Sequence, residues 1–332
     1  MAQLPAKPKK PKVSKATGEI VVPGIKRYPD RKRGWEIEHH GANIHVVKVK
    51  RPNMGNFEQW CLLLADNHVD SKGANNEMTK RLLAQAVERD AVVLCIGDSL
   101  DLMQGFSDRR GNKSALRSTL LSDNYFDRVI DQAADLFAPY ASHIGMLAQG
   151  NHESAWMRHH ETDPTAHLVR AIKDRAHSPV GTGGYGGWVK WQFELGGNKL
   201  TYTQRYHHGG GGSSLMSFGV LDVRRMYSMI EGADSIITSH LHTSNVVGIA
   251  REYLSTQNGV YKIEKKYCDF LRVGTTKDGW KDGSKGWEVE KNFGPSPLRQ
   301  KWIRIYLQWD SASKDNARRG VPRIAWDVHD AQ

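Results

Sequence analysis

The sequence predicts an α/β fold built around a buried sheet. Short, continuous apolar runs such as AVVLCIG and HIGMLA are typical of strands that are buried on both faces. Between these runs lie segments with apolar residues at helical spacing, such as NNEMTKRLLAQAVERD. The chain has 332 residues, of which 39% are hydrophobic and 25% charged. This length and composition indicate a globular chain that can bury a large core.

Residues 1–34 form a basic arm that we expect to be disordered, because Lys and Pro dominate it and large apolar residues are few. Residues 1–33 hold ten Lys or Arg and two acidic residues, so they carry +8 of the net charge of +11. Residues 35–332 are expected to form the folded domain. A basic arm on a nearly neutral body favours contact with a polyanion, and a solubilising tail is the alternative.

From Trp35 onward the pattern predicts the elements in order. NIHVVKVK and FEQWCLLLADNH are expected strands, NNEMTKRLLAQAVERD a helix, and AVVLCIGD a third strand. The polar segment 105–122 is predicted to be a functional or mobile loop, and its cations are Arg109, Arg110, Lys113 and Arg117. DNYFDRVIDQAADLFAPY is an expected helix, HIGMLAQGNHE a strand and a loop, and DPTAHLVRAIKDRA a helix that starts at Asp-Pro.

From Gly181 the sequence becomes Gly-rich, aromatic and β-like. SLMSFGVLDVRRMYSMIEGA is an expected helix, and DSIITSHLHTS an expected strand that ends in a His pair. Beyond Val246 we expect short strands and turns, with KWIRIYLQW the clearest strand. Trp188 and Trp191 share no face by simple alternation, which leaves base stacking and ordinary packing both open.

Cysteine usage and hydropathy bear on the compartment. Cys61, Cys95 and Cys268 are odd in number and not clustered, so we expect buried thiols rather than a disulfide framework. No apolar run approaches the roughly 18 residues of a membrane span, and the basic N-terminus lacks the apolar part of a signal peptide. We therefore expect a cytoplasmic protein without membrane contact.

Five polar blocks each follow an apolar run. They are Asp66-Asn67-His68, Gly97-Asp98-Ser99-Leu100-Asp101, Gly150-Asn151-His152-Glu153, His207-His208-Gly209 and His240-Leu241-His242. Because ligands collect at the carboxyl ends of strands in α/β sheets, we expect these blocks to meet. On an extended segment, residues two apart face the same way, so Asp66 and His68 can reach one ion. Mixed carboxylate and imidazole ligands suit Mn, Fe or Zn, and seven candidate ligands favour two ions over one tetrahedral site.

In this order, D-x-H, G-D-x-x-D, G-N-H-E, H-G and H-x-H resemble the motifs of the calcineurin-like metallophosphoesterase superfamily over about residues 60–245. The resemblance implies a central β-sandwich flanked by helices, and two divalent ions, with Mn favoured over Fe, Zn or Mg. The metal ligands that it implies are Asp66, His68 and His242 at the first ion, Asn151 and His240 at the second, and Asp98 at both, with His208 as a further ligand. His207 is the alternative to His208. The resemblance also implies that His152 acts as general acid or stabilises the transition state, and that Asp101 orients it.

The resemblance leaves several substrate classes open. Leu102 and Met103 stand where protein Ser/Thr phosphatases of the superfamily have an Arg after the second Asp, which disfavours a phosphoprotein substrate. The C-terminal stretch FLRVGTTKDGW … GPSPLRQKWIRI resembles small phage-type members described as DNA-repair-exonuclease-like. We therefore expect a phosphodiesterase, or nuclease, acting on nucleic acid or nucleotides, in the host cytoplasm if a phage encodes it. The alternatives are a phosphomonoesterase, including a protein phosphatase, and a non-catalytic nucleic-acid-binding protein.

Overall fold

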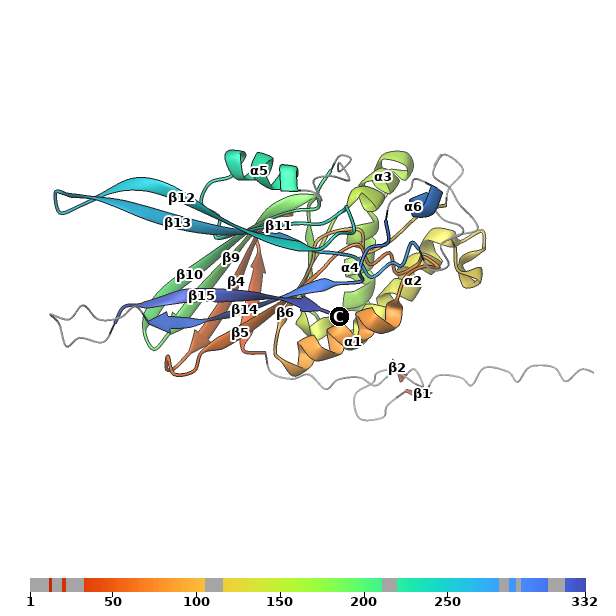
Figure 1. Ribbon diagram of the computed structural model, residues 1–332. Coiled ribbons are helices and arrows are strands. Elements are labelled where there is room, and N and C mark those ends of the chain that lie inside the picture. The colour runs from red at the N-terminus through yellow and green to blue at the C-terminus, as the bar shows by residue number, and fades with distance from the viewer. Residues whose placement is uncertain are drawn as a thin grey trace, which may run out of the picture.

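The fold is mixed α/β, with two large mixed sheets and flanking helices (Figure 1). It was obtained as a computed structural model, which describes residues 12–13, 20–21, 33–104, 116–210, 220–280, 287–290, 294–309 and 320–332. The predicted α/β class is therefore correct at this level.

The six-stranded sheet carries the longest apolar runs of the sequence. Its strands, in the order β15-β14-β5-β6-β7-β8, are β5 (Glu58–Leu64), β6 (Val92–Cys95), β7 (Ile144–Ala148), β8 (Gly181–Gly183), β14 (Gln300–Trp309) and β15 (Pro322–Ala331). Strands β5 to β8 run parallel, whereas β14 and β15 are antiparallel to their neighbours. Because the parallel strands are buried on both faces, they read as unbroken apolar runs. Their carboxyl ends lie along one edge of the sheet.

The seven-stranded sheet has the order β12-β13-β11-β10-β9-β4-β3. Its strands are β3 (Trp35–His39), β4 (Ile44–Arg51), β9 (Gly186–Leu195), β10 (Asn198–His207), β11 (Ser235–Thr238), β12 (Asn245–Gln257) and β13 (Val260–Arg272). Burial alternates along β4 and β9, because one face packs on the other sheet and one faces out. Trp191 is fully buried between the sheets, while Trp188 is half-buried on the opposite face beside Arg205.

The helices of the described ranges are α1 (Asn76–Glu88), α2 (Tyr125–Phe137), α3 (Asn151–His160), α4 (Pro164–Arg175), α5 (Val220–Met229) and α6 (Trp287–Glu290), with short 3-10 segments at Ser118–Leu120 and Ala138–His143. Helices α1, α2 and α4 pack on the outer face of the six-stranded sheet, and α5 lies on part of the outer face of the seven-stranded sheet. Side-chain caps fix two of the starts: Asn75 accepts the N–H of Met78, and Asp163 accepts those of Thr165 and Ala166. No helix in the described ranges is long and apolar enough to cross a membrane.

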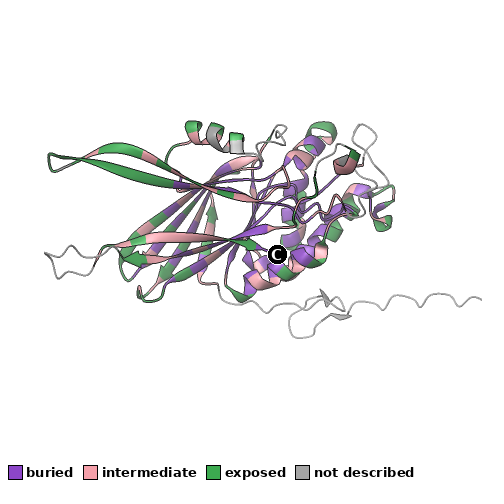
Figure 2. Cartoon of the chain, in the orientation of Figure 1, coloured by how far each residue is buried: buried purple, intermediate pink, exposed green. Residues whose placement is uncertain are grey.

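Three apolar clusters hold these layers together. The largest lies between the six-stranded sheet and helices α1, α2 and α4, and includes Leu83, Val129 and Ile172. The second fills the space between the sheets, and the third lies under α5 on the outer face of the seven-stranded sheet. Figure 2 shows the burial concentrated where the sheets and helices meet. Cys61, Cys95 and Cys268 are free and buried, as expected.

Three predictions about elements were wrong. The segment after β7 is not a loop, because α3 begins directly at Asn151. Residues beyond Val246 do not form only short strands, because β12 and β13 are 13 residues each and pair along their whole length. Arg117 is not a free cation of a basic loop, because its guanidinium donates to the carbonyls of Ser71 and Ala74.

Two other expectations fall largely outside the described residues. Arg109, Arg110 and Lys113 belong to the segment 105–115, which lies outside the described residues. Of the basic arm, the structure describes a two-residue pairing of β1 (Lys12–Val13) with β2 (Ile20–Val21), together with Arg33 and Gly34. Arg33 donates to the carbonyl of Ser142, and the N–H of Gly34 to the carboxylate of Asp90. Within the described residues, contacts of this N-terminal stretch with the folded body are therefore made by Arg33 and Gly34.

Candidate metal centre

The five polar blocks meet at one edge of the two sheets. Asp66 and His68 follow β5, Asp98 follows β6, and Asn151 opens α3 directly after β7. From the other sheet, His208 follows β10, and His240 and His242 follow β11. Two strands of each sheet therefore supply imidazole or carboxylate groups to the same place, as the strand-end pattern predicts.

The first group comprises Asp66, His68 and His242, whose nearest ligand atoms all lie within 4.8 Å of one another. His68 Nε2 is 3.3 Å from His242 Nε2, and His242 Nε2 is 3.8 Å from Asp66 Oδ1. The Oδ1 atom of Asp66 is buried and has no hydrogen-bond partner among the described residues. A buried carboxylate oxygen without a partner is costly, so its position beside two imidazoles fits a cation.

The second group comprises Asp98, His208 and His240, also within 4.8 Å of one another. Asp98 Oδ2 lies 3.2 Å from His208 Nε2 and 3.9 Å from His68 Nε2, so this carboxylate stands between the two groups. The Asn151 side-chain oxygen is 3.0 Å from His208 Nε2 and 2.8 Å from His240 Nδ1. Seven side chains thus form two adjoining buried groups that could hold metal ions.

Contacts to the Nδ1 atoms of His208 and His68 orient these imidazoles toward the centre. The carbonyl of Ile96 lies 2.9 Å from His208 Nδ1, and since a carbonyl only accepts, this nitrogen carries the hydrogen and leaves Nε2 for a ligand. The carboxylate of Asp101 lies 3.0 Å from His68 Nδ1, an ion-pair distance, while His68 Nε2 faces His242. Such outer contacts are typical of metal-binding histidines.

Asp66 and His68 were expected to face one ion because residues two apart on an extended segment face the same way. This reason is wrong, because the ligand segments are not extended. These two residues and Asp98, His240 and His242 all have positive φ, between 44° and 73°. The left-handed region costs a non-glycine residue about 1–2 kcal/mol. Strain of this kind clusters at functional sites, where the surrounding structure holds it in place.

Two glycines allow this close packing. A side chain at Gly150 would collide with the carboxylate of Asp98. At Gly97, where φ is +100°, a Cβ would lie 2.5 Å from His208 Nδ1. The glycines of the G-D and G-N blocks are therefore required because the two strand ends approach each other with no room for a Cβ.

Glu153 holds these strand ends together, a role that its place in the G-N-H-E block did not predict. Its buried carboxylate accepts the N–H groups of Asp98 (3.1 Å), Leu100 (3.0 Å) and Gly150 (2.8 Å). Burial and the charge of Asp98 raise the pKa of Glu153 to about 8. The carboxylate fixes the loop after β6 against the start of α3, and so sets Asp98 against Asn151.

The pKa values of the ligands fit a site built for cations. Burial and Lys277 lower the pKa of His68 to about 4, and burial and His208 lower that of His240 to about 4, so both imidazoles are neutral ligands near pH 7. Burial raises the pKa of Asp66 to about 8. Burial by itself lowers the pKa of His208, but the carboxylates of Asp98 and Asp66 raise it to about 10. Protonated His208 therefore places a positive charge between two buried carboxylates.

His152 stands at the edge of both groups rather than between them. Its Nδ1 lies 2.5 Å from the backbone carbonyl of Asp101, and its Nε2 lies 3.8 Å from Asp98 Oδ2. The Asp101 carboxylate is 3.7 Å from His152 Nδ1, so the carbonyl, not the carboxylate, is the hydrogen-bond partner. The predicted orientation of His152 by Asp101 is therefore made by the main chain.

Lys277 belongs to this site, although no sequence pattern predicted it. Its ammonium is 3.1 Å from Asp101 Oδ1, although the two residues are 176 positions apart. His68, Asp101 and His152 also lie close enough to hold an ion. Because Lys277 already supplies a positive charge to Asp101 and His152 Nδ1 faces a carbonyl, this third group is complete without a metal.

The structure also separates His208 from His207. His208 is fully buried and directs Nε2 at Asn151 and Asp98. His207 is half-buried, accepts the N–H of Gly209 at Nδ1, and packs against Tyr185. Among the described residues His207 belongs to none of the ligand groups. The geometry therefore favours His208 as the ligand.

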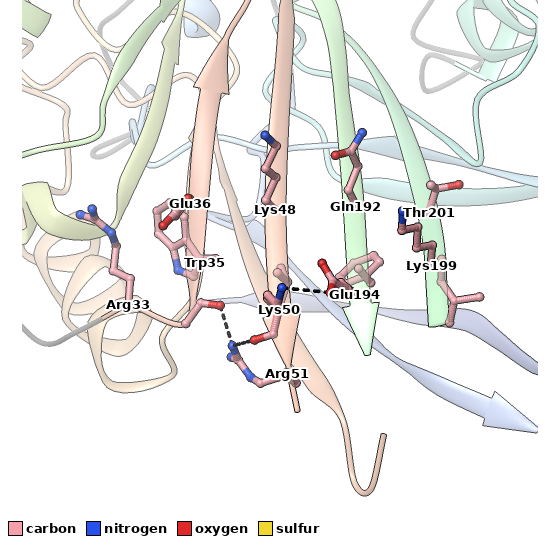
Figure 3. Close-up of a pocket in the computed structure, with 14 residues that line it drawn as sticks. Arg33, Trp35, Glu36, Lys48, Lys50, Arg51, Gln192, Glu194, Lys199 and Thr201 are labelled. Carbon is pink, nitrogen blue, oxygen red and sulfur yellow. Dashed lines mark hydrogen bonds and ion pairs between the residues drawn. The ribbon is translucent and has the colours of Figure 1, made fainter. Parts of the chain in front are cut away.

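A groove of about 920 Å³ lies away from this centre, on the outer face of β3, β4, β9 and β10 (Figure 3). Its lining is basic, but Lys50 pairs with Glu194 at 3.0 Å, and Lys48 pairs with Glu38 just outside the groove. Arg51 donates to the carbonyl of Gly34. The groove holds none of the ligand groups found in the described part of the chain, so the chemistry is assigned to the buried centre.

No protein-family model and no curated protein matches the chain. Among solved structures, it is similar to an uncharacterised protein of Streptococcus pneumoniae described as a predicted phosphoesterase, with 12% identity, a TM-score of 0.27 and coverage of 82% of this chain and 99% of that one. It is also similar to GAP50, described as the anchor in the inner membrane complex of Plasmodium, with 12% identity, a TM-score of 0.33 and coverage of 74% and 81%. At TM-scores this low, the similarities do not indicate the activity of the chain.

Proposed function

We propose that the chain is a phosphoesterase that works with two divalent metal ions. The observation that carries this proposal is the pair of buried ligand groups that share the neighbourhood of Asp98, with His152 beside both. Asp66, His68 and His242 would hold one ion, Asn151, His208 and His240 the other, and Asp98 would contact both. When bound, two such ions neutralise phosphoryl charge and act as Lewis acids.

The role of His152 follows from its hydrogen bond. Because Nδ1 donates to the carbonyl of Asp101, the nitrogen that can exchange a proton is Nε2, which lies on the side of Asp98. The His152 side chain is 15% exposed, whereas the Asp98 side chain beside it is only 2% exposed. It can therefore reach a substrate and give a proton to the leaving oxygen.

We favour phosphodiesters of nucleic acid or nucleotides as substrates, with Mn as the metal. The basic arm of residues 1–33 supports a polyanionic substrate. Leu102, at the position where protein phosphatases of the resembled superfamily have an Arg, is buried in the core and supplies no charge to a phosphoprotein.

Hydrolysis of bis-p-nitrophenyl phosphate and of p-nitrophenyl phosphate, each with Mn²⁺, tests the proposal. A phosphodiesterase should prefer the diester, whereas a preference for the monoester would move the function to a phosphomonoesterase. Hydrolysis of neither substrate, in protein that binds the ions, would favour a non-catalytic nucleic-acid-binding protein. A panel of single-stranded DNA, duplex DNA, RNA and cyclic nucleotides then identifies the substrate.

Adjacent histidines provide a matched pair of variants. His208→Ala should lose an ion and nearly all hydrolysis, because His208 faces Asn151 and Asp98. His207→Ala should keep both ions and retain activity within about threefold, since its imidazole accepts the N–H of Gly209 and packs on Tyr185 but belongs to none of the described ligand groups. The reverse result would exchange the two histidines in the assignment.

A further inference from the structure

Strands β12 and β13 form a ribbon that projects from the seven-stranded sheet (Figure 1). Near the body, β13 pairs with β11 only over Asp269–Arg272. From the tip to about Ala250, the ribbon has two strands and exposed side chains (Figure 2). A two-stranded ribbon is marginally stable in water unless another layer covers one of its faces. The described chain supplies no such layer over this outer half.

The two faces of the ribbon differ in what lies on them. Residues paired directly across an antiparallel ribbon point to the same side. One face continues the buried Phe270, packs beside α5 near the body, and carries Arg251, which stacks on Tyr227. The other face carries Leu254 opposite Ile263, and Tyr261 and Tyr267 on either side of that pair. These four are 67%, 70%, 73% and 64% exposed, respectively.

We propose that this second face, defined by Leu254, Tyr261, Ile263 and Tyr267, is the interface of a two-fold dimer with a second copy of the chain. The four side chains expose roughly 500 Å² of mainly apolar surface. A standard interface buries about 800 Å² per partner, so this face supplies more than half of what one copy needs. An exposed apolar patch of this size is comparable to the largest patch on a typical monomer, and such patches are often functional.

Charge favours a second copy over a polyanion. In the outer half of this face, the charged residues are Glu252 and Lys265, which lie directly opposite each other across the strands. Asp269 lies on the same face nearer the body, where its carboxylate accepts the indole N–H of Trp326. The outer half is therefore neutral, and a copy brought against it by a two-fold axis meets the same balanced pair. A nucleic acid or an anionic membrane would need a basic face. The cations Lys262 and Lys266 point to the opposite side.

The experiment measures mass by sedimentation and light scattering from 1 to about 100 µM. The wild-type chain should have twice the 37.3 kDa of one copy. The double variant Leu254→Thr/Ile263→Thr keeps β-branched residues in the strands and should weaken the dimer at least 100-fold, as expected for central interface residues. Tyr253→Thr, on the other face of the same ribbon, is the matched control and should remain dimeric.

Each outcome is decisive because the four side chains of the proposed interface belong to none of the three apolar clusters and to none of the ligand groups. Unchanged melting temperature and ion content in the double variant would show that it is folded. A monomeric wild type over the whole range would overturn the proposal, and so would a double variant that remains dimeric. If the chain were a monomer and its binding to anionic vesicles or DNA depended on Leu254 and Ile263, this face would bind another partner. That result would also overturn the proposed dimer.

Discussion

Replacing Glu153 by Ala should destabilise the folded state by about 3–5 kcal/mol. Three buried N–H groups, of Asp98, Leu100 and Gly150, lose their acceptor, and each such loss costs about 1–3 kcal/mol before the loops relax. Glu153→Gln should cost less, about 1–2 kcal/mol, because one amide oxygen can still accept from Asp98 and Gly150. Its NH₂ group would then face the N–H of Leu100.

Urea unfolding followed by tryptophan fluorescence measures this loss, with EDTA present so that lost ions do not contribute. Glu88→Ala, at an exposed position of α1, is the control and should change the free energy of unfolding by less than about 0.5 kcal/mol. With Mn²⁺ added, Glu153→Gln should also bind ions 10- to 100-fold more weakly, roughly the effect of losing an outer contact at a metal site. If Glu153→Ala stayed within about 1 kcal/mol of wild type, the carboxylate would not hold these strand ends together.

Three further predictions concern other parts of the chain. His152→Ala should keep both ions but lower kcat by roughly 10²–10⁴, and by less for substrates with good leaving groups, because these need no proton; loss of ions on elemental analysis would instead make His152 a ligand. His45 Nδ1 lies 2.8 Å from His39 Nδ1, and burial and the charge of His39 lower the pKa of His45 to about 4. The contribution of neutral His45 to the free energy of unfolding is therefore complete above pH 6.5 and is lost as the pH falls toward 4. Urea titrations in EDTA should therefore show a flatter pH dependence for His45→Gln than for wild type, and parallel curves would refute this. Deleting residues 1–32 should leave the fold and the ion content unchanged. If the substrate is a nucleic acid, the deletion should flatten the slope of log K for binding against log salt concentration by about 0.7–0.9 per lost phosphate contact. An unchanged slope would indicate that the arm is only a solubilising tail.

The sequence was most informative where burial is complete. Strands β5, β6 and β7 are buried on both faces, so each reads as an apolar run, and the polar residues that follow mark the strand end. Asp66, Asp98 and Asn151 could therefore be placed at one sheet edge from the sequence alone. His208 could not be chosen over His207, because the two side chains differ only in which side of the chain they leave.

Elements with weak burial contrast were missed. Helix α3 buries only Glu153, Ala155 and Trp156 of its ten residues, so its sequence shows little helical periodicity and reads as a loop. The outer halves of β12 and β13 are exposed on both faces, and without a buried face no alternation sets their length.

Contacts between distant residues were also out of reach. Lys277 meets Asp101 because the segment after β13 passes the loop after β5, where Thr275 donates to the carbonyl of Asp66 and Asn67 donates to Thr276. Likewise, no pattern distinguishes a backbone carbonyl from a carboxylate as the partner of His152. These contacts depend on the path of the main chain around the centre, which the side-chain types do not encode.

The number of ions in active protein tests the central claim most directly. Protein purified without chelator, loaded with Mn²⁺ and desalted, should contain two ions per chain by elemental analysis while it hydrolyses a phosphoester. Asp98→Asn should fall to one ion or none and lose nearly all activity, because Asp98 stands between both ligand groups. A wild-type chain that hydrolyses phosphoesters with one ion or none would contradict the two-metal centre.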